Sequence, residues 1–435
     1  MQVIADLQIH SRFARAVSPQ MIPSVISEWA GKKGIGLVAT GDWTHPLWFR
    51  ELQANLVESG DGIFKAKDAA PSAPNFLLST EVSSIYSQGG KTRKIHTLIF
   101  SPSFEVSAKI NKELTIRGAN LMSDGRPIMG ITAKQVAEIA LEIDERCLII
   151  PAHAWTPHFS LYGSVSGFDS IAECFGEIAP YIYAIETGLS SDPAANWRVE
   201  DLNSRSIVSF SDAHSPQKLG REATIFEIKE LSYEAVRGAI IGDKENKIAS
   251  TLEFYPEEGK YHFTGHRNCK VVYSPNEARK LGTICPVCAR PLTVGVMSRV
   301  EHLAKKEVET EIETDSFGVR WIHPAGRVKP PYTMMVPLME ILAEAYEVGV
   351  GSRKVIEGYQ NLISSLGSEF KILLETNPPD IERIAGVRIA EAISKVRSGD
   401  IVIEPGYDGV FGKVKIWPED KKQEEATNIN QTTLF

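Results

Sequence analysis

The chain begins with the stretch Val3-Ile-Ala-Asp-Leu-Gln-Ile-His10, in which an apolar run ends in alternating polar residues. Successive side chains of a β-strand point to opposite faces, so Asp6, Gln8 and His10 share one face. A metal site at a strand end would use such a face, although it more often has a second histidine where this chain has Gln8. The stretch therefore predicts a strand that delivers ligands, one of them unusual.

Six further apolar runs in the first 250 residues end in the same way, in an acid or a histidine. They cover 34–45, 75–84, 94–100, 147–156, 182–191 and 206–215. Amphipathic helical patterns lie between several of them, at 21–34, 132–144 and 168–178. Strands that alternate with helices predict βα units around a parallel sheet. Because the polar residues follow the strands, the α/β fold that we expect is a β/α barrel with its site at the mouth.

Composition limits the class of protein. At 435 residues the chain is long enough for two or three domains. A net charge of −8 argues against coating of nucleic acid by the whole surface, but it permits a local basic groove. Neither a signal pattern nor an apolar run long enough to span a bilayer is found, so we expect a cytoplasmic protein with no membrane partner. Five cysteines in such a chain favour a metal role over a disulfide framework.

The strand ends together favour a metal cluster. Six of the ten histidines lie in the first 250 residues, and several strand ends carry a histidine or a carboxylate. A single histidine near a strand end is more often structural. Several buried carboxylates at one mouth, however, need cations to neutralise them. Mixed histidine and carboxylate ligands suit Zn²⁺, Mn²⁺ or Fe²⁺, with two or three ions close together.

These motifs and their order resemble a known superfamily. The stretches D-x-Q-x-H (6–10), T-G-D-W-T-H (40–45), S-T-E (79–81), R-K-I-H (93–96), P-A-H (151–153) and S-D-A-H (211–214) resemble the PHP (polymerase and histidinol phosphatase) metallophosphoesterases. Over roughly residues 1 to 417 the chain is most similar to the endonuclease Q family. The resemblance implies a distorted seven-stranded β/α barrel with up to three metals. It also implies a DNA repair endonuclease that nicks 5′ of uracil, hypoxanthine, xanthine and abasic sites, leaving a 3′-hydroxyl and a 5′-phosphate.

The resemblance also implies a set of ligands. His10, Glu81 and Asp212 would hold one metal, and Glu81 would bridge to a second metal held by His96 and His153. A third metal would use His214 with either Asp42 or His45, and the catalytic residues implied are His10, Glu81, Asp212 and His214. Gln8 departs from the family pattern. Its carbonyl oxygen is a weak ligand that suits Mg²⁺ or Mn²⁺ better than zinc.

A second motif predicts a structural zinc site. His266-x-x-Cys269 and Cys285-x-x-Cys288 form two short-spaced ligand pairs. Three thiolates and one imidazole suit a closed tetrahedral Zn²⁺ site, which would stabilise a small module without a large core.

The predicted domains are a catalytic barrel (1–250), a zinc module (251–299), a mostly helical DNA-binding part (300–417) and a disordered tail (418–435). Within the third part, residues 380–393 resemble half of a helix-hairpin-helix with Gly386 at the turn, although ordinary helix packing explains the pattern equally well. The tail ends in Q-T-T-L-F, which resembles a sliding-clamp-binding peptide anchored by Gln431, Leu434 and Phe435.

The loop 187–191, at the end of the run 182–191, is our candidate wall for a base pocket, through Gly188, Ser190 and Ser191. Two other functions stay open at this point. One is a small-molecule phosphatase like histidinol phosphatase, which leaves the zinc module and the tail without a purpose. The other is a clamp-tethered DNA-binding scaffold with degenerate metal sites, for which Gln8 is the only indication.

Overall fold

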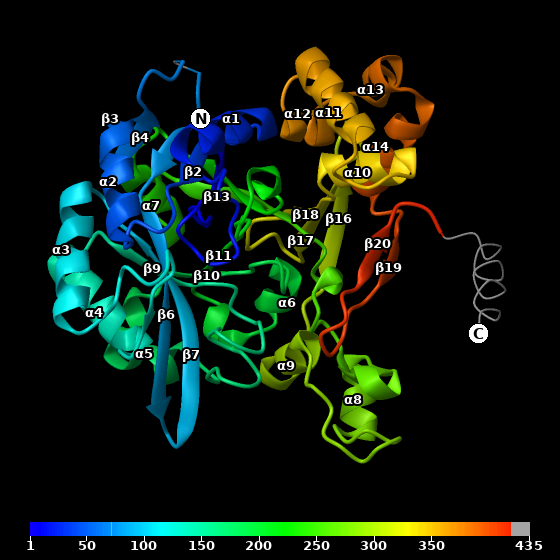
Figure 1. The fold of residues 1–435 in the computed structure, drawn as a ribbon. Helices are drawn as coiled ribbons and strands as arrows, with labels where there is room; N and C mark the ends of the chain where they lie inside the picture. Colours follow the sequence, from blue (N-terminus) through cyan, green and yellow to red (C-terminus); the bar gives the residue numbers. More distant parts are fainter. Residues whose placement is uncertain (71, 419–435) are drawn as a thin grey trace, which may run out of the picture.

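The computed structural model describes residues 1–70 and 72–418 and has a mixed α/β fold (Figure 1). All seven apolar runs of the catalytic region form strands where the sequence predicts them. They are β1 (Gln2–Asp6), β2 (Leu37–Ala39), β5 (Asn75–Leu77), β7 (Lys91–Phe100), β9 (Leu148–Pro151), β10 (Ala184–Glu186) and β11 (Ser206–Val208). The first three pair in parallel, as expected of βα units.

The predicted helices of this half also form, and local sequence signals set their ends. They are α1 (Pro23–Lys33), α4 (Ala133–Ile143) and the short α5 (Ile171–Phe175). Thr132 and Gln135 form a reciprocal capping box at the start of α4, and Gly34 ends α1 with a φ of 89°. The other elements of this half are α2 (Pro46–Asn55), β3 (Leu56–Gly60), β4 (Ile63–Ala66), β6 (Ser79–Gln88), α3 (Phe104–Ile116), β8 (Ile128–Met129), α6 (Pro193–Trp197), β12 (Ala223–Glu227), α7 (Tyr233–Ile241) and β13 (Lys247–Glu253).

The seven strands belong to three separate sheets. β1, β2 and β5 lie in a ten-stranded sheet of order β16-β17-β18-β13-β12-β1-β2-β5-β4-β3. β7 and β9 lie in a four-stranded sheet of order β8-β6-β7-β9, and β10 pairs with β11. Within the described residues, the seven strands are therefore not paired in one continuous sheet, but single backbone hydrogen bonds, such as that of 3.0 Å from the N–H of His10 to the Ala213 carbonyl, link strand ends of different sheets.

The main sheet continues beyond the catalytic region. β13 pairs in parallel with β18 (Tyr332–Met334), and β17 (Arg320–Pro324) and β16 (Thr310–Thr314) extend the sheet from there. The predicted mostly helical part thus begins with three strands, and the predicted boundary at residue 250 falls inside β13. Strand formation at 310–334 depends on pairing with distant segments, which local sequence does not reveal.

The predicted zinc module lies between β13 and β16. It contains β14 (Thr264–His266), β15 (Val271–Tyr273), α8 (Pro275–Leu281) and α9 (Val296–Leu303). Helix α9 crosses the predicted boundary at residue 299, so the module does not end there as a separate unit.

The helices of the C-terminal part lie together at one end of the molecule (Figure 1). They are α10 (Leu338–Tyr346), α11 (Arg353–Leu366), α12 (Glu369–Leu374), α13 (Pro378–Ala385) and α14 (Val387–Ser398), followed by the hairpin strands β19 (Val402–Glu404) and β20 (Lys413–Lys415). α12 is joined to the catalytic region by an ion pair of 2.8 Å between Lys33 on α1 and Glu369, both fully or nearly buried.

The segment that resembles a helix-hairpin-helix forms two helices, α13 and α14, joined at Gly386. Gly386 has a φ of 89°, and no other atom lies within 4 Å of the position that a Cβ would occupy. Ile389 and Ile393 of α14 are buried, whereas Val387 at its start is exposed. Helix packing and an exposed turn therefore coexist here. The predicted clamp-binding residues and all of the predicted disordered tail except Pro418 lie outside the described residues.

Among the residues that the structure describes, no helix combines the length and the apolar character needed to cross a membrane.

Candidate functional site

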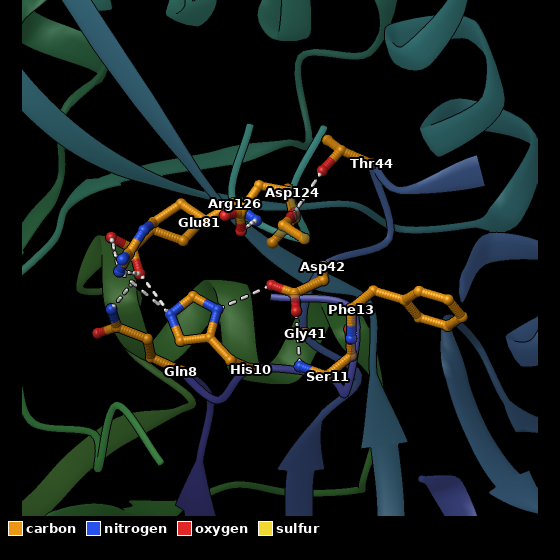
Figure 2. A network of polar contacts seen from close by, with 12 residues as sticks. Gln8, His10, Ser11, Phe13, Gly41, Asp42, Thr44, Glu81, Asp124 and Arg126 are labelled. Atoms are coloured by element: carbon orange, nitrogen blue, oxygen red, sulfur yellow. Dashed lines mark hydrogen bonds and ion pairs between the residues drawn. The ribbon is translucent and has the colours of Figure 1, made fainter. Parts of the chain in front are cut away.

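Glu81, on β6, is the centre of a buried cluster of polar side chains. Its Oε1 lies 2.5 Å from Nδ1 of His96, on β7, and 3.4 Å from Nε2 of His153, which follows β9. Its Oε2 lies 3.0 Å from Nε2 of His10. Figure 2 shows Glu81, His10 and Gln8 pointing toward one another. Residues far apart in the chain thus meet at Glu81, as the sequence predicts.

A second group adjoins the first through His10. Oδ1 of Asp212 lies 3.2 Å from Nε2 of His10 and 3.7 Å from Nδ1 of His214. The rings of His10 and His214 meet edge to face, with centroids 4.8 Å apart. His214 also contacts the backbone carbonyl of Asp212 through Nδ1, at 2.8 Å. A carbonyl oxygen only accepts hydrogen bonds, so Nδ1 of His214 is the donor. In the neutral imidazole the lone pair then lies on Nε2.

Asp42 and His45, which the sequence leaves as alternatives for one ligand, have different positions. Oδ1 of Asp42 lies 2.9 Å from Nδ1 of His10, and its Oδ2 accepts a hydrogen bond of 2.5 Å from the backbone N–H of Ser11 (Figure 2). His45 instead stacks on Phe13, with centroids 4.5 Å apart, and its Nδ1 caps α2. Asp42 is therefore placed to orient His10, and His45 belongs to the packing around α2.

Gln8 contacts the same cluster through its amide. Its Nε2 donates a hydrogen bond of 2.9 Å to Oε2 of Glu81, while its Oε1 is buried without a partner. The side chain therefore helps to fix Glu81. It also carries one buried oxygen whose hydrogen-bonding capacity is unused.

Three members of the site have unusual backbone conformations. Asp42, His153 and Asp212 have positive φ angles of 44°, 29° and 47°. Non-glycine residues rarely adopt such angles, and they concentrate at functional sites, where the surrounding structure maintains the strain. The backbone is thus bent to turn these side chains toward the cluster.

Arg126 is a member of the site that sequence reasoning did not find. Its Nη1 lies 3.4 Å from Nε2 of His10 and 3.4 Å from Oε1 of Glu81 (Figure 2). Glu81 raises the pKa of Arg126 further, although burial opposes this. Arg126 comes from the loop before β8, where neither a motif nor a strand end marks it.

The charges of the cluster depend on one another. Burial alone would raise the pKa of Glu81, but Arg126 and His96 hold it well below its usual value. Burial alone would lower the pKa of His10, but Asp42, Asp212 and Glu81 raise it well above its usual value. Burial lowers the pKa of His96 to about 4, so His96 is a neutral imidazole at pH 7.

The donor sets fit divalent cations. The ligand atoms of Glu81, His96 and His153 lie within 4.8 Å of one another, and so do those of His10, Asp212 and His214. Histidine nitrogens beside carboxylate oxygens suit borderline divalent metals. The orphaned oxygen of Gln8 adds a further donor beside Glu81, so the residues present fit a group of metal ions.

A cavity of about 470 Å³ opens beside these residues. His153 and Asp212 line it, together with Gly188 and Ser190 from the loop after β10. A Cβ at Gly188 would overlap Cβ of His153, so this loop is tightly packed against a candidate ligand. Ser191 is not among the lining residues; it is fully buried and accepts a hydrogen bond of 3.0 Å from the Asn196 amide. Two of the three residues predicted for a base pocket thus line a cavity next to the cluster.

The four predicted zinc ligands also converge. The ligand atoms of His266, Cys269, Cys285 and Cys288 lie within 4.8 Å of one another. Burial alone would raise the pKa of Cys285, but His266 and the backbone N–H groups of Val287 and Cys288 lower it to about 6.

The two halves of this site have similar turns. Lys270 and Ala289, which follow Cys269 and Cys288, both have positive φ angles, of 55° and 58°. Two similar turns that bring four ligand atoms together fit a structural Zn²⁺ ion.

This chain is similar in sequence and structure to known proteins. The family model of the MJ0043 C-terminal domain matches residues 337–400, which contain α10 to α14. The crystal structure of the lesion-specific endonuclease PfuEndoQ from Pyrococcus furiosus is similar with a TM-score of 0.81 and 31% sequence identity. The match covers 98% of this chain and 99% of that one.

Two other relatives bear on the same question. A structure of endonuclease Q with a 27-mer duplex substrate, which has an abasic lesion at the active site, has the same TM-score and identity. That match covers 97% of this chain and 100% of the other. The uncharacterized protein MJ0043 of Methanocaldococcus jannaschii is 31% identical over 284 residues, or 63% of this chain. The match spans about one third (33%) of the length of that protein.

Proposed function

Because this chain belongs to the endonuclease Q family, we propose that it is a metal-dependent, lesion-specific DNA endonuclease. More finely, we propose that it nicks the phosphodiester 5′ of uracil, hypoxanthine, xanthine and abasic sites, and leaves a 3′-hydroxyl and a 5′-phosphate. The observation that carries the proposal is the contact between the cavity and the ligand cluster. His153 and Asp212 belong to both, so a nucleotide held in the cavity would have its phosphate beside the metal ligands.

We propose that the catalytic region is a distorted seven-stranded β/α barrel. One buried apolar cluster supports this, because it includes side chains from all seven strands although the strands lie in three sheets. These side chains are Val3, Leu37, Leu77, Leu98, Leu148, Ala184 and Val208. In this proposal, residues 251–299 would hold a structural zinc ion. Residues 300–417 would contact DNA, with the exposed turn at Gly386 as one contact.

Within the site, the residues of the chain have separate tasks. Glu81 would bridge two cations, with His96 and His153 on one side and His10 and Asp212 on the other. His214 would present Nε2 to a further cation, and Asp42 would hold His10. Divalent cations in these positions polarise a phosphodiester and make an attacking water more acidic. Arg126 would donate to a phosphate oxygen and would offset its charge as the bond breaks.

To select the lesion, the protein must detect a chemical difference between a deaminated base and a normal base. Deamination replaces an exocyclic amine, which is a donor, by a carbonyl, which is an acceptor. A cavity wall that donates would accept the product and would leave a normal amine unpaired, at a cost of about 1–3 kcal/mol. The base must leave the stack to be read, and this is easiest at a mispair. Ser190 lines the cavity, and its hydroxyl donates to the Thr187 carbonyl at 3.0 Å, so we propose that this hydroxyl turns from the carbonyl to donate to the flipped base.

The test is incubation of the purified protein with duplexes that carry uracil, hypoxanthine or an abasic site, and with an undamaged duplex. We expect nicking only beside the lesions, abolished by chelator and restored by Mn²⁺ or Mg²⁺. Glu81→Gln should be inactive although it binds the same duplexes. Hydrolysis of small phosphomonoesters without nicking would instead support a phosphatase. Less than one metal per chain beyond the structural zinc would support a DNA-binding scaffold.

Binding of the C-terminal Q-T-T-L-F peptide to a sliding clamp remains a prediction. A peptide of residues 418–435 should bind a clamp in a fluorescence polarisation assay. Replacement of Leu434 and Phe435 by alanine should abolish that binding.

A further inference from the structure

An exposed aromatic ring lies at the cavity beside the catalytic cluster. Phe411 lines the cavity with His153 and Asp212, yet 66% of it is exposed. It comes from the loop between β19 and β20, almost 200 residues beyond Asp212 in the chain. Large apolar side chains that remain exposed beside a site are typical of contacts with a ligand.

The loop that carries Phe411 is held against the wall of the cavity by its backbone. Gly406 N–H donates to the Glu257 carbonyl at 2.8 Å, and Gly412 N–H donates to the Glu258 carbonyl at 3.1 Å. A Cβ at Gly412 would overlap the Glu257 carbonyl, so glycine is required for this close approach. The backbone on both sides of Phe411 is therefore fixed.

The tip of the same loop has further contacts. Asp408 accepts hydrogen bonds of 2.7 Å from the backbone N–H of Arg267 and 2.5 Å from the Thr293 hydroxyl, both in the zinc module. Gly409 N–H donates to the Lys260 carbonyl at 2.9 Å. The module that holds the zinc ligands thus supports the loop, which gives the ring a defined position without covering it.

Lys260 adds a charge to this ring. Its Nζ lies 4.4 Å from the centroid of the Phe411 ring, and Lys260 itself lines the cavity. A cation against an aromatic face is a favourable arrangement that helps to keep the ring in place. The ammonium group also lies at the mouth of the cavity, where a nucleic acid backbone would bring phosphates.

We propose that Phe411 is a positioning residue that stacks on the base adjacent to the flipped lesion and fills the gap left in the duplex. This inference rests on the proposed function. Removal of a base from the stack exposes the faces of its neighbours, and an aromatic side chain replaces the lost stacking whatever the sequence. The fixed loop favours this replacement, because the backbone that carries the ring is already held in place before DNA binds.

The test compares duplex with single-stranded DNA. Phe411→Ala should lower kcat/KM for a uracil-containing duplex about 10- to 100-fold, the factor that one aromatic–base stack supplies. The loss should be larger for uracil paired with adenine than for uracil paired with guanine, because the mispaired base leaves the stack more easily. The same lesion in a single strand has no duplex stack to repair, so its rate should change by less than about threefold. Phe411→Trp should retain most of the duplex activity.

Two further measurements separate this role from a structural one. A 2-aminopurine next to the lesion should show a fluorescence change on binding to inactive Glu81→Gln that is reduced when Phe411→Ala is added. Val410→Ala, on the same loop but outside the cavity lining, should leave both rates unchanged. Equal losses on duplex and single strand, or no loss on either, would overturn the proposal. Failure of the unmodified protein to nick any lesion would count against the proposed function instead.

Discussion

Asp42 and His45 lie three residues apart, and the structure predicts opposite consequences for their substitution. Asp42→Asn keeps the shape of the side chain, and asparagine tolerates the φ of 44° at this position. It removes the charge that lies 2.9 Å from Nδ1 of His10, and it can set an amide N–H₂ against the Ser11 N–H. We therefore expect a correctly folded protein in which His10 is poorly oriented.

The magnitude follows from the role of Asp42 as a support for a ligand. Loss of such a support typically costs 10- to 100-fold in activity or metal affinity, or about 1.4–2.8 kcal/mol. His45→Gln should behave differently, because His45 stacks on Phe13 and caps α2. Its cost should be about 1 kcal/mol of folding stability, with little change in the nicking rate of the folded fraction.

The assay uses three measurements on each variant: the single-turnover nicking rate on an abasic-site duplex, metal content by mass spectrometry, and urea denaturation. Asp42→Asn should change the first two, and His45→Gln should change only the third. Loss of a metal from His45→Gln, with full metal content and full rate in Asp42→Asn, would refute this assignment and would make His45 the ligand.

Three other predictions follow from single contacts. Gly188→Ala should reduce nicking at least tenfold and should also lower the melting temperature, because the new Cβ would overlap Cβ and Cα of His153 and because Gly188 has a φ of 54°; nicking and melting assays will check this. Cys285→Ser, or strong chelation followed by gel filtration, should remove one zinc and lower the melting temperature, whereas Cys147→Ser, away from the zinc site, should keep the full zinc content. Burial raises the pKa of Glu253 to about 7 from 4.5, so its stabilising effect is present below pH 4.5 and is lost as the pH rises through 7. Glu253→Gln should therefore gain up to about 3 kcal/mol relative to the unmodified protein between pH 4.5 and pH 8, and denaturation curves that stay parallel across this range would contradict it.

The ligand cluster was accessible to sequence reasoning because strand ends mark it. Glu81, His96 and His153 each lie at or near an apolar run, but β6, β7 and β9 pair antiparallel, so the register of this pairing brings the three side chains together. The sequence does not predict which of Asp42 and His45 belongs to the site, because this depends on which side chain turns toward His10. The positive φ at Asp42 decides this, and no sequence pattern at this position signals it.

Features that depend on long-range packing were missed. Arg126 reaches the cluster from a loop with no motif, and Phe411 reaches the cavity from the far end of the chain. Of the strands at 310–334, β18 pairs with β13, β17 with β18 and β16 with β17, so their formation is a property of the whole sheet. Local patterns predict elements and their ends well, but they do not predict which distant elements become neighbours.

The parallel pairing of β13 with β18 has a consequence for shortened versions of this protein. A fragment that stops at residue 250 would end inside β13 and would lose the neighbour that covers its outer side. β12 and the remnant of β13 would then present unpaired N–H and C=O groups, a template for pairing with a second molecule. We expect such a fragment to aggregate, whereas one that ends after β18 retains this part of the sheet intact. Production of an isolated catalytic region therefore requires the chain at least through residue 334, zinc ligands included.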